Sequence, residues 1–192
     1  QPPVTDSPDV IAKELRKRLE ASIQSRMEGG NVGSWLSGGL DSSTMAALAR
    51  PHVTKLHTFA AGTPGAPDLE FARVVADFIH SEHHERIIHP QEIFSVLADV
   101  IYALESFDAW LIRSSVMNYL VAKTASDFVP AVFSGEGGDE LFAGYEYLKS
   151  IDLASLPEEL VDITNRLHNT ALQRVDRCSS AFGTVAHVPF LD

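Results

Sequence analysis

A serine- and glycine-rich segment in the N-terminal part of the chain has the composition of an anion-binding loop. It reads Ser37-Gly38-Gly39-Leu40-Asp41-Ser42-Ser43. Its small side chains leave the backbone N–H groups unobstructed, and a helix that begins near Asp41 would point its positive end at the same place. The Gly-Lys-Ser/Thr ending of the Walker loop is absent. Because Asp41 would repel a phosphate, we expect a Mg2+ ion between the two.

A second segment places three carboxylates within five residues. It reads Ser134-Gly135-Glu136-Gly137-Gly138-Asp139-Glu140. Acidic, glycine-rich loops are often only solvated turns, and a Gly-Gly pair alone is usually a tight turn. These carboxylates follow an apolar run and repel one another, however, so we expect a cation beside them. Tyr145 and Tyr147 follow this loop and either close the site or anchor its turn.

Strands that alternate with helices lead into both loops. The apolar pattern predicts strands at 32–36, 55–61, 84–89 and 130–134, and helices at 8–27, 41–49, 68–79, 90–104, 114–126 and within 157–182. This alternation is typical of an α/β fold, a parallel sheet sandwiched by helices, here with a helical C-terminal part. Ligands of such sheets bind beyond the carboxyl ends of the strands, so we expect both loops at one edge.

The composition limits the class of protein and of partner. With 192 residues, 45% of them hydrophobic, the chain is predicted to form a single domain over 1–192. A formal net charge of −11 argues against an extended nucleic-acid surface. No stretch is long enough to span a membrane. The single cysteine, Cys178, rules out an intrachain disulfide, fits a cytoplasmic location and is interpreted as a packing residue.

Four motifs together resemble the synthetase domain of the asparagine synthetases. They are SGGLDSS at 37–43, HTFAAGTPGAPD at 57–68, SGEGGDELFAGY at 134–145 and VPFLD at 188–192. They occur in order over nearly the whole chain and are far more specific together than any one alone. The resemblance implies the PP-loop ATP pyrophosphatase fold, which agrees with the strand and helix pattern.

The resemblance also implies a ligase reaction with ATP and Mg2+. ATP would be split between its α and β phosphates, with release of pyrophosphate and transfer of AMP to a carboxylate, by default the side chain of aspartate. Ammonia would then displace AMP to give asparagine. The alternative is a catalytically incomplete nucleotide-binding subunit or regulatory module that needs a partner chain.

Individual residues take roles by their match to the family motifs. The implied catalytic residues are Glu136, which would act on the adenylate and ammonia as a general base, and Arg113 near the phosphates. Asp41 and Asp139 would bind Mg2+. The implied ATP-binding set is Leu36, Ser37, Gly38, Gly39, Leu40, Asp41, Ser42, Ser43, Ala61, Asp68, Ser134 and Gly135.

The chain ends suggest a piece of a longer protein. It begins at Gln1, without the glutaminase domain and catalytic cysteine of family members that use glutamine, so ammonia would be free or supplied by a glutaminase or another companion chain. It stops at Asp192, before the helices that carry a family lysine, for which Lys149 is a weak substitute. We therefore expect a domain truncated at both ends; its oligomeric state is open, with a homodimer among the alternatives.

Two stretches depart from the family pattern. His187 stands where an arginine usually precedes VPFLD, which replaces a permanent charge with one that titrates near neutral pH. Trp110 and Leu111 stand where hydroxyl residues commonly precede the Ile-Arg pair. The phosphate contacts of that second stretch are therefore open.

A histidine cluster is a weaker candidate site. His80, His83 and His84 lie close to Glu82 and Glu85 and could suggest a metal site. A polar helix end that runs into a strand is the favoured interpretation, because no other ligands with zinc-like spacing accompany them.

Overall fold

One parallel sheet forms the centre of the chain. The computed structural model describes residues 5–27 and 30–192. In this part the strands are β1 (Val32–Trp35), β2 (His57–Gly62), β3 (Glu82–Ile87), β4 (Ala131–Phe133) and β5 (Val185–His187). They pair in the order β3-β2-β1-β4-β5, and every pairing is parallel. The predicted α/β fold is thus confirmed.

The connections diverge between β1 and β4. The chain passes from β1 outward to β2 and β3, whereas it passes from β4 outward to β5 on the other side. Ser34 of β1 is in register with Phe133 of β4, so both strands reach the same edge side by side. This divergence is the place where open α/β sheets bind ligands, and both motif loops follow it directly.

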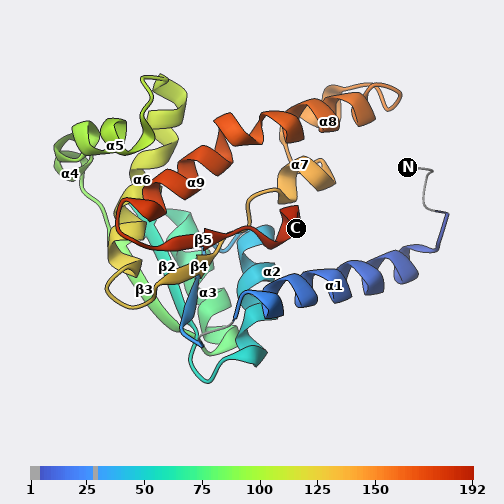
Figure 1. Cartoon of the computed structure of the whole chain (residues 1–192), viewed down its shortest axis with the longest axis horizontal. Helices are drawn as coiled ribbons and strands as arrows, with labels where there is room; N and C mark the ends of the chain where they lie inside the picture. The colour runs from blue at the N-terminus through green and yellow to red at the C-terminus, as the bar shows by residue number, and fades with distance from the viewer. Residues whose placement is uncertain (1–4, 28–29) are drawn as a thin grey trace.

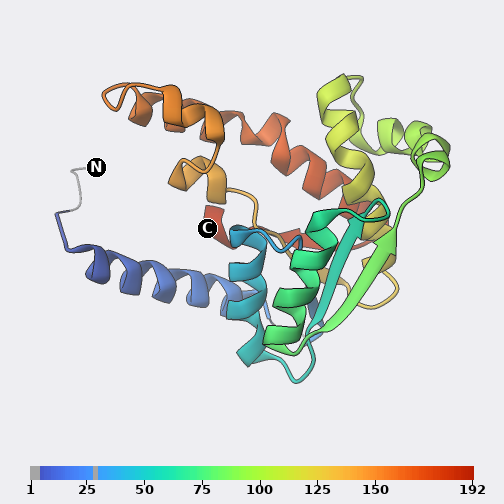
Figure 2. The same cartoon turned by 180° about the vertical axis from the view of Figure 1, so that it is seen from behind.

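Helices cover both faces of the sheet (Figures 1 and 2). On one face α2 packs on β1 and α3 on β2, with α1 against α2, whereas α6 and α9 cover the other face together with α5. The helices are α1 (Pro8–Ser25), α2 (Leu40–Ala49), α3 (Pro67–Ile79), α4 (Pro90–Ser95), α5 (Leu97–Leu104), α6 (Ala109–Ala125), α7 (Gly138–Phe142), α8 (Leu156–Arg166) and α9 (Ala171–Ser180). Short 3-10 turns cover Arg50–His52, Glu146–Ser150, Leu167–Asn169 and Pro189–Leu191.

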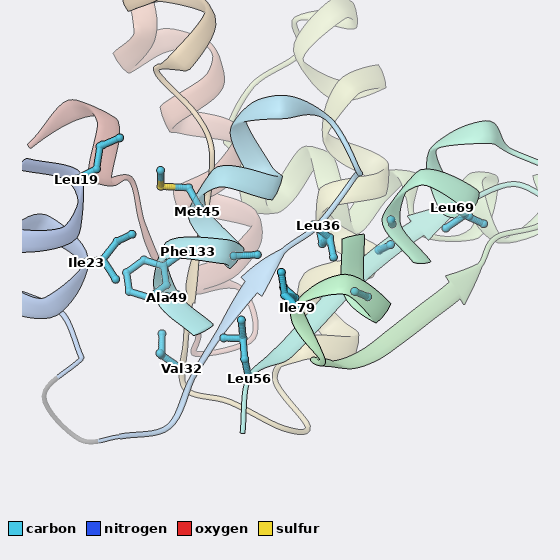
Figure 3. Close-up of a cluster of buried hydrophobic side chains, with 14 residues drawn as sticks. Leu19, Ile23, Val32, Leu36, Met45, Ala49, Leu56, Leu69, Ile79 and Phe133 are labelled. Atoms are coloured by element: carbon cyan, nitrogen blue, oxygen red, sulfur yellow. The ribbon is translucent and has the colours of Figure 1, made fainter. Parts of the chain in front are cut away.

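Alternating side chains of the strands supply a core to each face. Val32 and Leu36 pack with Met45 of α2 and with α1 and α3, as Figure 3 shows. The intervening Trp35 points to the opposite face, where it packs with Phe59 and α6. Successive residues of a strand point to opposite faces, so a strand covered on both faces is buried along its whole length. In 32–36 the large apolar side chains of Val32, Trp35 and Leu36 fill the two cores, and the small Ser34 is buried between them.

The structure differs from the predicted elements in several places. β5 and α7 were not predicted, because each is too short for a periodic pattern of apolar residues. The predicted helix 90–104 is interrupted at Val96, which divides it into α4 and α5. The helical stretch 157–182 divides at Thr170, where the backbone leaves helical geometry.

None of the helices in the described ranges combines the length and apolar character that a membrane crossing requires.

Candidate active site

The loop after β1 is held in place by its own serines and by α3. The Ser37 N–H donates to Ser42 Oγ at 3.2 Å, and the Ser42 hydroxyl donates to the Gly39 carbonyl at 3.2 Å. No side chain caps the start of α2, so its first N–H groups face the loop without a competing acceptor. Gly38 has a φ of +79°, and a Cβ there would lie 2.5 Å from the backbone of Phe71 in α3.

The acidic loop after β4 touches the loop after β1. A Cβ on Gly135 would lie 2.8 Å from the Ser42 nitrogen, and a Cβ on Gly138 would lie 2.4 Å from the carboxyl carbon of Asp41. Only glycine permits both approaches, because a real Cβ does not approach other atoms so closely. The glycines of the second motif thus bring its carboxylates beside Asp41.

A cavity of about 790 Å³ opens where the two loops meet. Helices α6 and α9 contribute Asn118 and Arg174 to its wall. Most of the predicted site residues line it, namely Leu36, Ser37, Gly39, Leu40, Asp41, Ser42, Ala61, Asp68, Ser134, Gly135, Glu136 and Asp139. The structure therefore gathers residues from the ends of three strands around one space.

Three predicted site residues do not line this cavity. Gly38 packs against α3, and the Ser43 hydroxyl is buried with no hydrogen-bond partner in the described part of the chain. Arg113 is exposed on the first turns of α6, where its guanidinium lies 5.8 Å from the ring centre of Trp110. A phosphate contact by Arg113 stays a prediction.

The carboxylates around the cavity raise one another's pKa values. Burial raises the pKa of Asp41 most, and the charges of Asp139, Glu140 and Glu136 raise it further. The pKa of Asp139 is raised by burial and then by Glu140. A divalent cation would relieve this repulsion, and Mg2+ is commonly held by one or two carboxylates together with phosphate oxygens and water. The donor set of Asp41 and Asp139 fits that ion.

Arg174 of α9 is a site residue that sequence reasoning missed. Its guanidinium lies 2.6 Å from a carboxylate oxygen of Glu136. Burial raises the pKa of Glu136, and Arg174 opposes that rise by charge and hydrogen bonding. No motif surrounds Arg174, and 38 positions separate the two residues, so only the packing of α9 reveals the pair.

Of the two tyrosines that follow the acidic loop, Tyr145 lines the cavity and Tyr147 does not. The Tyr145 hydroxyl donates to the buried carboxylate of Glu140, and Tyr145 also lines the cavity. Burial and this carboxylate raise the pKa of Tyr145, so the phenol stays protonated as the donor. The Tyr147 hydroxyl instead donates to Glu159 of α8 at 2.8 Å, outside the cavity.

The C-terminal motif 188–192 packs against the acidic loop. A Cβ on Gly137 would lie 2.6 Å from the side chain of Leu191, and Figure 1 shows the chain end beside α7. The Ser134 N–H donates to the His187 carbonyl at 2.8 Å. Burial and the charge of Arg26 lower the pKa of His187, so its ring is uncharged at neutral pH. This position therefore contributes backbone contacts to the site without a charge.

Cys178 and Lys149 lie away from the cavity lining. Cys178 is fully buried among α5, α6 and α9, and burial raises the pKa of its thiol to about 12. The interpretation of Cys178 as a packing residue is confirmed. Lys149 lies 2.6 Å from Glu146 in an exposed ion pair.

Comparison with known protein families agrees with the fold and the site described above. The profile of the family described as asparagine synthase matches residues 14–162. This chain belongs to the asparagine synthase family. The match spans both loops and the strands β1 to β4, so it includes most of the residues that line the cavity.

Curated members of the asparagine synthase family are similar over nearly all of the chain. A probable glutamine-hydrolyzing asparagine synthetase of Schizosaccharomyces pombe is 40% identical over 94% of this chain and 36% of its own length. Asparagine synthetase B of Escherichia coli is 38% identical over 93% of this chain and 35% of its own length. The chain thus spans about a third of the length of these relatives.

A solved structure supports the fold. The NMN synthetase of Francisella tularensis superposes with a TM-score of 0.50 at 21% identity, over 73% of this chain and 59% of that chain. At this identity the likeness extends to the arrangement of strands and helices alone.

Proposed function

We propose that this site forms an amide bond at the expense of ATP, with the side chain of aspartate as the acceptor. Aspartate would be adenylated with release of pyrophosphate, and ammonia would then displace AMP to give asparagine. The single observation that carries the proposal is the contact of Gly138 with the carboxylate of Asp41. It supports the proposal because it brings backbone N–H groups and carboxylates to one cavity, where they could serve phosphates and a metal ion.

The cavity lining offers groups for both parts of ATP. Leu36 and Ala61, with Trp35 and Phe59 beside them, offer apolar surface to an adenine ring. Loop 37–43 offers backbone N–H groups and serine hydroxyls to the phosphates. Asp41 and Asp139 would hold Mg2+, which would supply positive charge to the phosphate oxygens. Arg113 would reach the phosphates only if the first turn of α6 moved toward the cavity.

Glu136, which lines the cavity, would accept a proton in the second step. When the nitrogen of ammonia bonds to the acyl carbon, the bond from that carbon to the AMP oxygen breaks, and the nitrogen must lose a proton. Arg174 favours the ionised form of Glu136, which is the form that accepts this proton. A general base with a pKa raised toward neutral by burial is suited to that task.

Product analysis tests the proposal directly. The chain is incubated with ATP, Mg2+, aspartate and an ammonium salt, and AMP, pyrophosphate and asparagine are measured. The proposal expects the three products in equal amounts. ADP and inorganic phosphate in their place would contradict it. ATP binding without AMP or pyrophosphate would favour the alternative, a nucleotide-binding module that another chain completes.

The ammonia source needs a second arm of the same experiment. The similar relatives are named as glutamine-hydrolyzing. We propose that glutamine supports the reaction only when a glutaminase is present, as a companion chain or in the same protein. Replacing the ammonium salt with glutamine, with and without added glutaminase, checks this dependence.

A further inference from the structure

Two imidazoles and a carboxylate converge at the end of the sheet opposite the cavity. His57 begins β2, Glu82 begins β3, and His84 lies two residues further along β3. The parallel register sets His57 opposite Glu82 and Phe59 opposite His84, so the three ligand side chains share one face. One ligand atom from each lies within 4.8 Å of those of the other two.

The distances suit a borderline divalent cation. His57 Nδ1 lies 2.8 Å from His84 Nε2 and 3.9 Å from Glu82 Oε2. Zinc bonds of about 2.0–2.2 Å to nitrogen and oxygen separate neighbouring ligand atoms by roughly 3.3–3.6 Å in a tetrahedron. The two imidazole nitrogens would have to move apart by roughly 0.5–0.8 Å to admit the ion. Glu82 is exposed, so the position is open to solvent and to a water ligand.

We propose that His57, Glu82 and His84 bind Zn2+ or a similar divalent ion that joins β2 to the edge strand β3. Two imidazole nitrogens and one carboxylate oxygen are a donor set that zinc accepts, whereas Mg2+ favours oxygen ligands alone. The ring of Phe128 lies 4.0 Å from that of His84 and covers the site from one side. This site is separate from the ATP cavity, so it does not depend on the proposed ligase activity.

The register of the sheet explains why the sequence pattern did not reveal the site. The histidine cluster 80–84 was set aside because it lacked a further ligand with suitable spacing. His57 is that ligand, and it comes from the neighbouring strand. Conversely, His83 points to the other face, where its Nδ1 lies 3.0 Å from the Thr58 hydroxyl. His80 ends α3 and is not part of the group.

A pair of variants separates metal binding from the ion pair already present. Lys55 Nζ lies 2.5 Å from Glu82 Oε2, so Glu82→Gln and Lys55→Met both break this ion pair, but only Glu82→Gln removes a metal ligand. The full chain is stripped with a chelator and titrated with Zn2+ by calorimetry at pH 8, where unperturbed imidazoles are neutral, in excess Mg2+ to occupy the acidic loop. We expect one equivalent of Zn2+ to bind to the wild type.

The variants are expected to differ in their affinity for Zn2+. Glu82→Gln should weaken Zn2+ binding at least about tenfold, since even changes outside the ligand set cost about 10–100-fold. Lys55→Met should bind as tightly as the wild type or more tightly, because it removes a competing cation. His84→Gln should lose the site, whereas His89→Gln, a histidine outside the group, should keep it.

Two results would overturn the proposal. One is a wild type that takes up no stoichiometric Zn2+. The other is a Glu82→Gln variant that binds Zn2+ like the wild type, which would show that Glu82 is not a ligand of the bound ion. The Glu82→Gln result stands even if His84→Gln fails to fold, because the exposed Glu82 side chain contributes little to the core.

Discussion

The loop after β1 and the loop after β4 meet at one cavity but are stabilised by different kinds of contact. Loop 37–43 carries a single carboxylate and is held by hydrogen bonds among its own serines and by the packing of Gly38 on α3. Loop 134–140 carries three carboxylates, of which Glu136 contacts Arg174 and Glu140 contacts Tyr145. A serine- and glycine-rich loop can thus be held largely by local hydrogen bonds. A half-buried acidic loop needs partners for its charges, here Arg174 of the distant helix α9 and the neighbouring Tyr145, because isolated buried charges are costly.

The largest expected effect tests the chemical role of the acidic loop. Glu136→Gln keeps the size of the side chain but removes the proton acceptor. We expect asparagine formation to fall about 10²- to 10⁴-fold, the usual contribution of a general base, with ATP affinity changed only a few-fold. Glu146→Gln is the matched control, since Glu146 lies in an exposed pair with Lys149. A fully active Glu136→Gln enzyme would remove Glu136 from the mechanism.

The next effect tests whether the first loop depends on backbone geometry. Gly38→Ala places a methyl group against the backbone of α3 at a positive φ. Strain and overpacking together predict a loss of about 2–5 kcal/mol in the free energy of unfolding. Gly39→Ala should cost at most about 1 kcal/mol, as for a weak N-cap replacement, because its nearest neighbour would be Ser37 Oγ at 3.4 Å. Urea unfolding of both variants decides; equal losses would contradict the prediction.

A smaller effect tests the partners of the second loop. Tyr145→Phe removes the donor to the buried Glu140. A hydrogen bond to a charged group predicts a loss of about 1.5–3 kcal/mol in the free energy of unfolding. Tyr147→Phe removes the same hydroxyl from the surface pair with Glu159, and we expect a change within about 0.5 kcal/mol. If the two variants lost equal stability, the burial of Glu140 would not explain its dependence on Tyr145.

The smallest effect concerns repulsion between the loops and its pH dependence. Because the pKa of Asp139 is raised in the folded state, the folded chain holds this proton more tightly than the unfolded chain. Stability from this group is therefore present at low pH and lost as pH rises through the raised pKa. Without divalent ions, Asp139→Asn should be more stable than the wild type near pH 7, with the difference shrinking toward about pH 4.

Urea unfolding at several pH values measures that difference. Added Mg2+ is the control, since it should stabilise the wild type more than Asp139→Asn and thereby close the gap at neutral pH. A variant that is less stable than the wild type near pH 7 in the absence of Mg2+ would show that Asp139 makes net favourable contacts in the metal-free fold.

Much of the fold followed from patterns that are local in the sequence. The strands β1, β2, β3 and β4 were predicted within a few residues. For β1, β2 and β4 the signal is a short, largely apolar run between helical patterns. The polar strand β3 was predicted from the alternation of strands and helices. β5 was missed, because its three residues are only partly buried and carry no periodic signal. Its place in the sheet depends on pairing with β4 across more than fifty residues, which no local pattern encodes.

The candidate site was likewise predicted where it depends on local sequence and missed where it depends on contacts between distant segments. Most of the motif residues after β1 and β4 line the cavity as expected, since parallel strands end at one edge. Arg113 was assigned by its match to a family position, yet its side chain lies over Trp110 outside the cavity. Arg174 and His57 were not assigned, because each meets its partners only through tertiary packing.

By itself, the sequence determined most of the segments that become strands, which loops carry backbone donors and which carry carboxylates. These properties depend on residue type and on periods of two or 3.6 residues. The tertiary structure alone decided the strand order, the contact of Gly138 with Asp41, and the charge partner of Glu136. Those features depend on distances between segments far apart in the chain, and such distances are set by register and packing.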